Sequence, residues 1–183
     1  MLDVKILIGD SEIPVGHSIM ERLIDAIPDE PGYEQAYRRL ALFGSTKVQE
    51  AIASRESIDA ETVEILLRSK QVNVLRPLLC NPRAQEALTQ REAMQIANSN
   101  QPELLGTLAW NLGDFSLCSP LEILQRLAAN TDPWVRALVI DRPSAPLEML
   151  ETLSKDDDPD VQRGARKAIE ERENESDSML GDE

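Results

Sequence analysis

Residues 119–136, SPLEILQRLAANTDPWVR, decide the fold, because the same pattern returns at residues 145–162 as APLEMLETLSKDDDPDVQ. Pro120 and Pro146, Leu124 and Leu150, and Asp132 and Asp158 are each 26 residues apart. A fixed period of this length is typical of stacked helical repeats, in which each helix pair buries its apolar face against the next.

Four columns of apolar residues carry this register back through the chain and give five repeats, in steps of 26, 30, 31 and 26 residues. Spacings of three and four residues within each helix place the columns on one buried stripe. The two longer steps predict short insertions at residues 84–91 and 111–118. The columns are Tyr37, Val63, Ala93, Leu124 and Leu150; Leu40, Leu66, Ile96, Leu127 and Leu153; Val48, Val74, Leu104, Val135 and Val161; and Ile52, Leu78, Leu108, Val139 and Ala165.

Capping residues agree with this register. Ser45, Gln71, Gln101, Asp132 and Asp158 precede the second helix of each repeat, where Ser and Asp accept bonds from the first amides. Pro102, Pro133 and Pro159 follow at the first helical position, where a missing amide costs nothing. Ser119 and Glu122 have the spacing of a capping box. Pro77 falls inside a predicted second helix and predicts a bend there.

We therefore predict an all-α fold, an α-solenoid in the form of a HEAT-like superhelix of about five helix pairs with an N-terminal helical cap. Residues 1–32 are predicted to be an arm and capping helix, with the helix at about residues 16–27. Val4, Ile6 and Ile8 alternate like a short strand, which either packs as an extended arm on the first repeat or pairs with another chain. Residues 33–169 form the repeat domain, and residues 170–183 are predicted to be a frayed helix end and a disordered acidic tail.

Charge and composition narrow the possible partners. The chain has 183 residues and a net charge of −14, which opposes binding to nucleic acid or to an anionic membrane surface. No apolar run is long enough to span a membrane, and no signal peptide opens the chain. Cys80 and Cys118 lie far apart and suit a reducing compartment, each as a small buried residue. These features predict a cytoplasmic protein.

Residues 127–150, LAANTDPWVRALVIDRPSAPLEML, resemble the variant leucine-rich repeat, a relative of HEAT and armadillo repeats. Residues 48–63 are similar to the same unit without its prolines, and the resemblance extends over residues 33–169. It implies short helix pairs wound into a superhelix, usually a scaffold that binds proteins. One family member carries an iron–sulfur cluster on a separate cysteine cluster, but nothing here matches that cluster, so no metal or cofactor is carried over.

By analogy with HEAT-like solenoids, the second helices line the binding face. Trp110 and Trp134 fall on that face in adjacent repeats and, with Arg76 and Arg163, form the predicted partner-binding site. The alternative is that each tryptophan fills the groove between repeats. The residue 111–118 insertion either contributes a binding loop or tucks Leu112 and Phe115 into the core. Arg55 and Arg142 end second helices, where an ion pair between repeats is expected.

No catalytic set can be assembled from the sequence. His17 is the only histidine, and no phosphate-binding loop, metal-spaced cluster or catalytic triad is present. Residues 156–158, three aspartates, are interpreted as a linker followed by a helix cap. We therefore expect a non-enzymatic scaffold for a protein or peptide partner. The alternatives are a HEAT-like DNA glycosylase and an acidic inhibitor or immunity-type protein that masks a basic effector.

Overall fold

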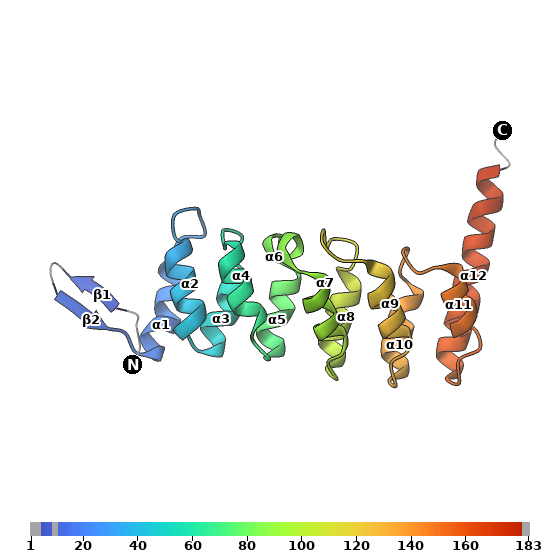
Figure 1. Cartoon of the computed structure of the whole chain (residues 1–183), viewed down its shortest axis with the longest axis horizontal. Coiled ribbons are helices and arrows are strands. Elements are labelled where there is room, and N and C mark those ends of the chain that lie inside the picture. Colours follow the sequence, from blue (N-terminus) through green and yellow to red (C-terminus); the bar gives the residue numbers. More distant parts are fainter. Residues whose placement is uncertain (1–4, 9–10, 181–183) are drawn as a thin grey trace. The chain divides into compact units, whose positions relative to one another are not determined.

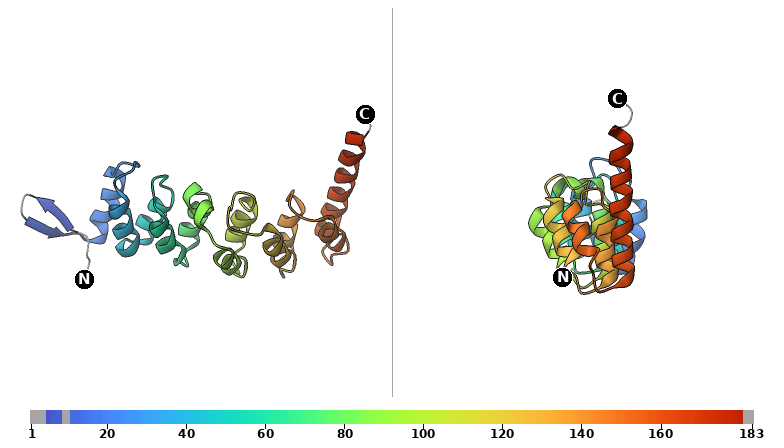
Figure 2. Two further views of the ribbon diagram at one scale, coloured as in Figure 1. Left: turned by 45° about the horizontal axis from the view of Figure 1, so that its top comes forward. Right: turned by 90° about the vertical axis from the view of Figure 1, so that its right-hand side faces the viewer.

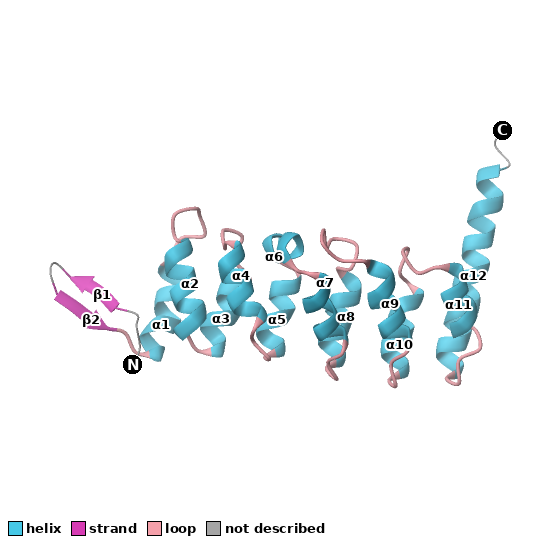
Figure 3. Ribbon diagram, viewed as in Figure 1, coloured by secondary structure: helices cyan, strands magenta, loops and turns pink. Residues whose placement is uncertain are grey.

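The computed structural model describes residues 5–8 and 11–180. Within this part, twelve α-helices and one short 3-10 helix account for almost all regular structure, and a single two-stranded sheet accounts for the rest (Figure 3). The predicted all-α class is confirmed apart from this sheet. The chain divides into two compact units, which we call unit 1 (Met1–Leu88 with Asp114–Leu117) and unit 2 (Thr89–Gly113 with Cys118–Glu183). The superhelix depends on both units together and stays a prediction.

The N-terminal sheet is a hairpin of β1 (Lys5–Ile8) and β2 (Ser11–Pro14), with Ile6 opposite Ile13. Residues 5–8 form a strand, which the sequence had left open, and it pairs with β2 of the same chain, an arrangement that neither sequence alternative predicted. With one large apolar residue and a terminal proline, Ser11–Pro14 lacks the alternation that indicates a strand. Residues 1–4 and 9–10 of the predicted arm lie outside the described residues.

The N-terminal cap consists of α1 (His17–Leu23) and the 3-10 helix η1 (Ile24–Ala26), which agrees with the helix predicted at residues 16–27. Met20 and Ile24 are buried. The Arg55 guanidinium donates a 2.7 Å hydrogen bond from Nη2 to the carbonyl of Ile24, so α3 is tied to the cap.

Unit 1 continues with two helix pairs, in which α2 packs on α4 and α3 packs on α5 (Figure 1, Figure 2). A short extra helix, α6, lies partly in the predicted insertion and is capped by Asn81, whose side chain accepts from the amide of Arg83. Pro77 lies inside α5, which continues to Leu79. The bounds are α2 (Glu34–Phe43), α3 (Thr46–Ala53), α4 (Ala60–Leu67), α5 (Val72–Leu79) and α6 (Pro82–Ala87).

Unit 2 contains three further helix pairs, with α8 against α10, α10 against α12, and α7 and α11 both against α9. All twenty residues of the four predicted columns, in both units, are buried. The five predicted helix pairs are therefore confirmed as local structure. The bounds are α7 (Gln90–Ala97), α8 (Pro102–Trp110), α9 (Pro120–Ala128), α10 (Pro133–Ile140), α11 (Leu147–Leu153) and α12 (Pro159–Leu180).

Both predicted aspartate caps are confirmed. Asp132 accepts from the amide of Trp134 at 2.9 Å, and Asp158 accepts from the amides of Asp160 and Val161 at 3.0 and 3.1 Å. Ser45 precedes α3, but its side chain forms no such cap, and its hydroxyl donates to Glu21 at 2.8 Å. The predicted prolines at the first helical position begin α8, α10 and α12.

The capping box predicted at Ser119 and Glu122 is wrong. The Gln90 side chain lies between them: its Oε1 accepts from the amide of Ser119, and its Nε2 donates to Glu122, both at 2.7 Å. A capping box does form at the start of α7, between Thr89 and Glu92.

The helix α12 continues beyond residue 169 to Leu180, through most of the segment that was predicted to be a frayed helix end and an acidic tail. Lys167 pairs with Glu171 at 3.1 Å, one turn further along the helix. Arg172 donates to the carbonyls of Ala145 and Arg142 at 2.6 and 2.8 Å. These contacts hold the helix past the last buried column. Residues 181–183 lie outside the described residues.

The two cysteines are not joined by a disulfide. Cys80 is exposed, which corrects the expectation that it is buried, and Cys118 is half-buried. Burial raises the pKa of the Cys118 thiol, with a smaller contribution from the nearby Glu92 carboxylate.

Candidate binding surface

Three of the four predicted site residues, Trp110, Trp134 and Arg163, lie in unit 2, and Arg76 lies in unit 1. Arg76 is exposed on α5. Arg163 is exposed on α12 and forms an ion pair with Asp160 of the same helix. The surface described below is therefore built from unit 2 alone, where both tryptophans lie on the outward face of α8.

Trp110 is the last residue of α8, and its side chain is 74% exposed. Leu104, Leu105, Leu108 and Ala109 turn the opposite side of this helix into the core. Glu103, Gly106 and Trp110 are spaced by three and four residues, so they share the outward face of α8.

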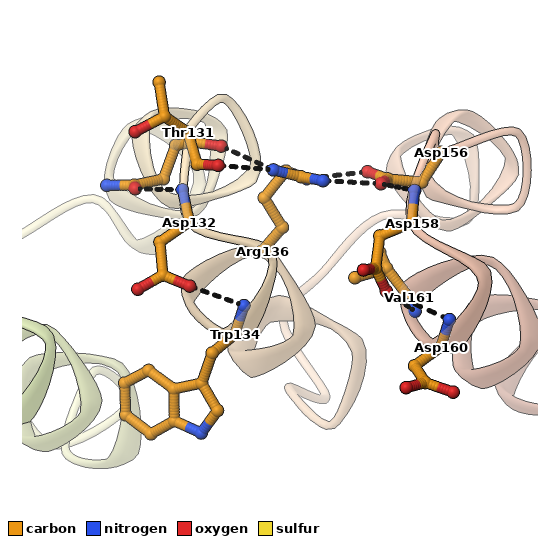
Figure 4. Close-up of polar contacts among 9 residues, drawn as sticks. Thr131, Asp132, Trp134, Arg136, Asp156, Asp158, Asp160 and Val161 are labelled. Atoms are coloured by element: carbon orange, nitrogen blue, oxygen red, sulfur yellow. Dashed lines mark hydrogen bonds and ion pairs between the residues drawn. The ribbon is translucent and has the colours of Figure 1, made fainter.

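Trp134 lies in the first turn of α10, directly after Pro133, and is 50% exposed. Its indole projects away from the polar contacts of that turn (Figure 4). The ring lies over Gly106: a Cβ at that glycine would be 2.9 Å from Cη2 of Trp134. Gly106 therefore leaves the space that the indole occupies.

Both indoles lie on the outward face of α8, although Trp134 belongs to α10. Trp134 covers Gly106, and Trp110 follows Gly106 by four residues on the same face. Residues with this spacing have Cβ atoms about 5–6 Å apart. We call the four residues Trp110, Gly106, Trp134 and Arg142 the tryptophan surface.

Arg142 follows α10 and stacks on Trp110, with its Cζ 4.9 Å from the ring centroid. Its Nη1 donates to the carbonyl of Ala109 at 3.5 Å. The expected ion pair between repeats is therefore wrong for Arg142, which contacts a ring and a carbonyl of the preceding helix pair. Arg55 likewise binds the carbonyl of Ile24. The shared column of Arg55 and Arg142 predicted a contact between repeats but not its acceptor.

The structure decides between the buried and the exposed alternative for the tryptophans and for the insertion. Neither tryptophan is buried in a groove between repeats, although Trp134 packs one part of its ring on Gly106. In the insertion at residues 111–118, Leu112 and Phe115 are buried, as the core interpretation of that segment predicted. Whether the exposed indoles bind a partner is taken up below as a proposal.

Beside the tryptophan surface, Arg136 of α10 forms two hydrogen bonds to Asp156, which lies just before α12 (Figure 4). Nη1 of Arg136 also donates to the carbonyls of Asn130 and Thr131, at 2.9 and 3.2 Å. The hydrogen bonds from Arg136 lower the pKa of the Asp156 carboxyl, against an opposing effect of burial. The interpretation of residues 156–158 as a linker and cap is confirmed, because Asp156 fixes the turn and Asp158 caps α12.

Unit 1 has a hollow of about 740 Å³ with an acidic lining. Two of its carboxylates hold local structure. Asp29 accepts from the amides of Glu56 and Ser57, and Asp59 caps α4 at Thr62 and pairs with Arg38. For both aspartates, burial raises the pKa, but these hydrogen bonds outweigh it and the pKa is lowered. The lining residues include Asp29, Glu34, Glu56, Asp59, Glu86 and Arg83.

Among residues 5–8 and 11–180, no three His, Cys, Asp or Glu side chains are grouped so that they could hold a metal ion. In the same residues, no helix combines the length and the apolar character that crossing a bilayer requires. His17 is the first residue of α1.

Residues 133–160 match the family described as leucine rich repeat variant. This segment runs from the start of α10 through α11 to the start of α12. The resemblance inferred from the sequence is thereby confirmed for these residues. No curated protein and no solved structure matches the chain.

Proposed function

We propose that this chain is a non-enzymatic scaffold that binds a protein or peptide partner through the tryptophan surface of unit 2. The observation that carries the proposal is the exposure of two adjacent indoles, at 74% and 50%. Tryptophan is highly buried on average in folded proteins. Tryptophan and arginine are also the residues most enriched in the energetic centres of protein interfaces.

The repeat architecture supports the same proposal. A variant leucine-rich repeat at residues 133–160 belongs to a class of helical repeats that present an extended surface to partners. Both tryptophans lie on second helices, α8 and α10, which are the helices that form the binding face in the proposed superhelix. Arg163 on the neighbouring α12 extends this face.

Charge disfavours the glycosylase alternative. Unit 2 contains 18 acidic and 9 basic side chains, for a net charge of −9, which repels a phosphate backbone. The acidic inhibitor is a special case of the proposed scaffold, because a basic effector is itself a protein partner. A cytoplasmic location remains a prediction from the sequence.

The test compares the wild-type chain with the double variant W110A/W134A as immobilised baits in native lysate. The matched control is L121A/L147A, which removes two exposed apolar side chains of unit 2 from the first helices α9 and α11. We expect a protein retained by the wild type and the control but lost from the tryptophan variant. Mass spectrometry identifies it, and titration of the purified pair measures the loss of affinity.

The same set of proteins retained on all three baits would contradict the proposal. Circular dichroism of each bait checks that the helices are intact, so a loss of binding reports on the surface.

A further inference from the structure

The hollow of unit 1 has the size of a ligand pocket. Its volume is about 740 Å³, within the range of about 300–1,000 Å³ that such pockets commonly enclose. Three parts of the chain form it: the loop and first residue of α2, the loop and first residue of α4, and the short helix α6. Part of the lining is apolar, from Pro31, Ile58, Ala60 and Ala87. The shape of the hollow and its apolar surface are thus properties that do not depend on its charge.

The charge of the hollow is strongly negative. Five carboxylates and one guanidinium belong to its lining, which gives a net charge of −4. Unit 1 as a whole contains 15 acidic and 10 basic side chains, for a net charge of −5. Charges of one sign along the wall of a depression raise the local concentration of ions of the opposite sign. The hollow is therefore suited to a cation.

Two of the five carboxylates have a cationic partner. Asp59 pairs with Arg38, with Oδ2 at 3.0 Å from Nε, and Glu86 pairs with Arg83, with Oε2 at 3.5 Å from Nη1. Arg83 is the one basic residue of the lining, and Arg38 lies outside it. These two pairs leave three carboxylates of the hollow for another cation.

The remaining three carboxylates are those of Asp29, Glu34 and Glu56, and none of them forms an ion pair within residues 5–8 and 11–180. The amide of Gly32 donates to Glu34 at 3.0 Å and lowers the pKa of that carboxyl, while the nearby charge of Asp59 opposes this effect. The carboxylates of the hollow are therefore close enough to repel one another, and a bound cation relieves that repulsion.

We propose that the hollow of unit 1 binds a lysine or arginine side chain of a protein partner. The aliphatic stem of such a side chain covers the apolar part of the lining, and its charged group is placed among Asp29, Glu34 and Glu56. A protein is the expected source because helical repeats present their surfaces to proteins. The hollow shares no residue with the tryptophan surface, so this is a second binding site beyond the proposed function.

The experiment titrates the isotope-labelled full chain with three probes and follows its backbone amide signals by NMR. The first probe is a capped peptide in which three arginines alternate with glycine. The second has citrulline at each arginine position, which keeps the shape of the side chain and removes its charge. The third is spermidine, which carries three positive charges without a peptide backbone. The amides of Ser57, Ala60 and Ala87 report on the hollow.

The titration with the arginine peptide is repeated on E34Q/E56Q, which removes two charges of the hollow. Glutamine keeps an oxygen that can accept from the Gly32 amide. The matched control is E50Q/E64Q, two exposed acids of α3 and α4 that are not part of the lining. Circular dichroism checks that both variants keep their helices.

We expect the arginine peptide to shift the amides of the hollow in a saturable way, with an affinity that falls as salt is added. E34Q/E56Q should weaken this binding by about threefold or more, whereas E50Q/E64Q should change it by less than about 1.5-fold. The citrulline peptide should cause no saturable shift at the same amides.

Equal shifts with the citrulline peptide would overturn the proposal, as would equal affinities of the two variants. Spermidine that binds the hollow at least as tightly as the arginine peptide would also overturn it, because the site would then take a free polyamine. A titration with no saturable shift at these amides has the same meaning. Each of these results leaves the proposed function standing, because W110A/W134A tests that function in the other unit.

Discussion

Arg136 and Asp156 face each other through two parallel hydrogen bonds, 2.7 Å from Nε to Oδ2 and 2.6 Å from Nη2 to Oδ1. Their side chains are only 15% and 9% exposed. The same carboxylate accepts from the amide of Asp158 at 2.9 Å, just before α12 begins. This pair therefore joins α10 to the turn that starts the last helix. Bidentate pairs of this kind are strong and geometrically specific.

The substitution Asp156→Asn removes the charge that pairs with Arg136 and keeps the side-chain oxygen that fixes the turn. Asn130, at the equivalent position 26 residues earlier, makes the same bond to the amide of Asp132, so an asparagine preserves the turn. Arg136 then keeps a mostly buried charge without its partner. We expect the free energy of unfolding to fall by about 3 kcal/mol, measured by urea titration. The control Asp157→Asn, at an exposed neighbour, should change it by less than about 0.5 kcal/mol. Equal effects of the two variants would contradict this assignment.

The same pair predicts a pH dependence. The pKa of Asp156 is lowered from its ordinary value of 3.8, chiefly by the hydrogen bonds from Arg136. A carboxyl with a depressed folded-state pKa contributes full stability above its unfolded-state pKa, and that contribution is lost as the pH falls through the folded-state value. Arg136 stays charged throughout. The stability difference between wild type and Asp156→Asn should be constant from neutral pH down to about 5 and shrink below about 4. Urea titrations at a series of pH values measure it, and a difference unchanged at low pH would disprove the link.

Gly106→Ala tests the packing of the Trp134 indole on Gly106. The new methyl group would meet Cη2 of the indole at 2.9 Å, the far end of a side chain that can move. Alanine also favours the helix over glycine by about 1 kcal/mol. In a W110F background, we expect unfolding stability to be unchanged or slightly raised, while the Trp134 emission shifts to the red and acrylamide quenching increases. Gly113→Ala, where a Cβ meets no atom within 4 Å, should leave the emission unaltered. An unmoved emission in Gly106→Ala would show that the indole does not rest on this glycine.

Arg142→Ala tests the stacking of Arg142 on the Trp110 ring. Loss of the stacked guanidinium and its bond to Ala109 should lower the free energy of unfolding by about 1–2 kcal/mol. In a W134F background, acrylamide quenching of Trp110 should increase. Arg166→Ala removes an exposed arginine of α12 and serves as the control. A similar quenching constant in both variants would rule out the stacked arrangement in solution.

Gly44→Ala tests the turn between α2 and α3. A Cβ at this position would overlap the carbonyl oxygen of Leu40 and lie 2.6 Å from Cγ1 of Val48. The Leu40 oxygen already accepts from the amide of Gly44 at 2.8 Å, so the backbone itself must shift. We expect a loss of about 1–3 kcal/mol in unfolding stability, measured by denaturant titration. Gly16→Ala, which meets nothing within 4 Å, should cost only a few tenths of a kcal/mol. A neutral Gly44→Ala would mean that this turn is looser than described.

The helix pairs were predictable because their signal lies in single residues at fixed spacing. All twenty column residues are buried, including Tyr37 in the first repeat and Ala165 in the last. The aspartate caps were equally predictable from the sequence, since Asp132 and Asp158 accept from amides only two or three residues further along the chain. The same register placed Trp110 and Trp134 outside the buried columns but left open whether they fill the groove between repeats, and both are exposed.

The features that sequence reasoning missed depend on contacts between distant segments. In place of the predicted capping box, the amide of Ser119 donates to the side chain of Gln90, 29 residues away. Arg142 donates to the carbonyl of Ala109, 33 residues away. The strand Ser11–Pro14 exists through its pairing with β1 rather than through its own composition. Likewise, α12 runs past the repeats because Arg172 reaches the loop before α11. No spacing rule within one helix specifies such partners.

The carbonyl contacts of Arg55, Asn81 and Arg142 all run backwards along the chain. Each side chain reaches the helix pair or cap before its own, where it meets the oxygen of Ile24, of Ala53 and Arg55, or of Ala109. Shortening such a chain is therefore directional. Removing a pair from the N-terminal side takes away acceptors, which leaves a donor that water can satisfy. Removing one from the C-terminal side takes these donors away from the helix left at the end, and a cut on either side exposes an apolar helix face that a terminal cap has to cover.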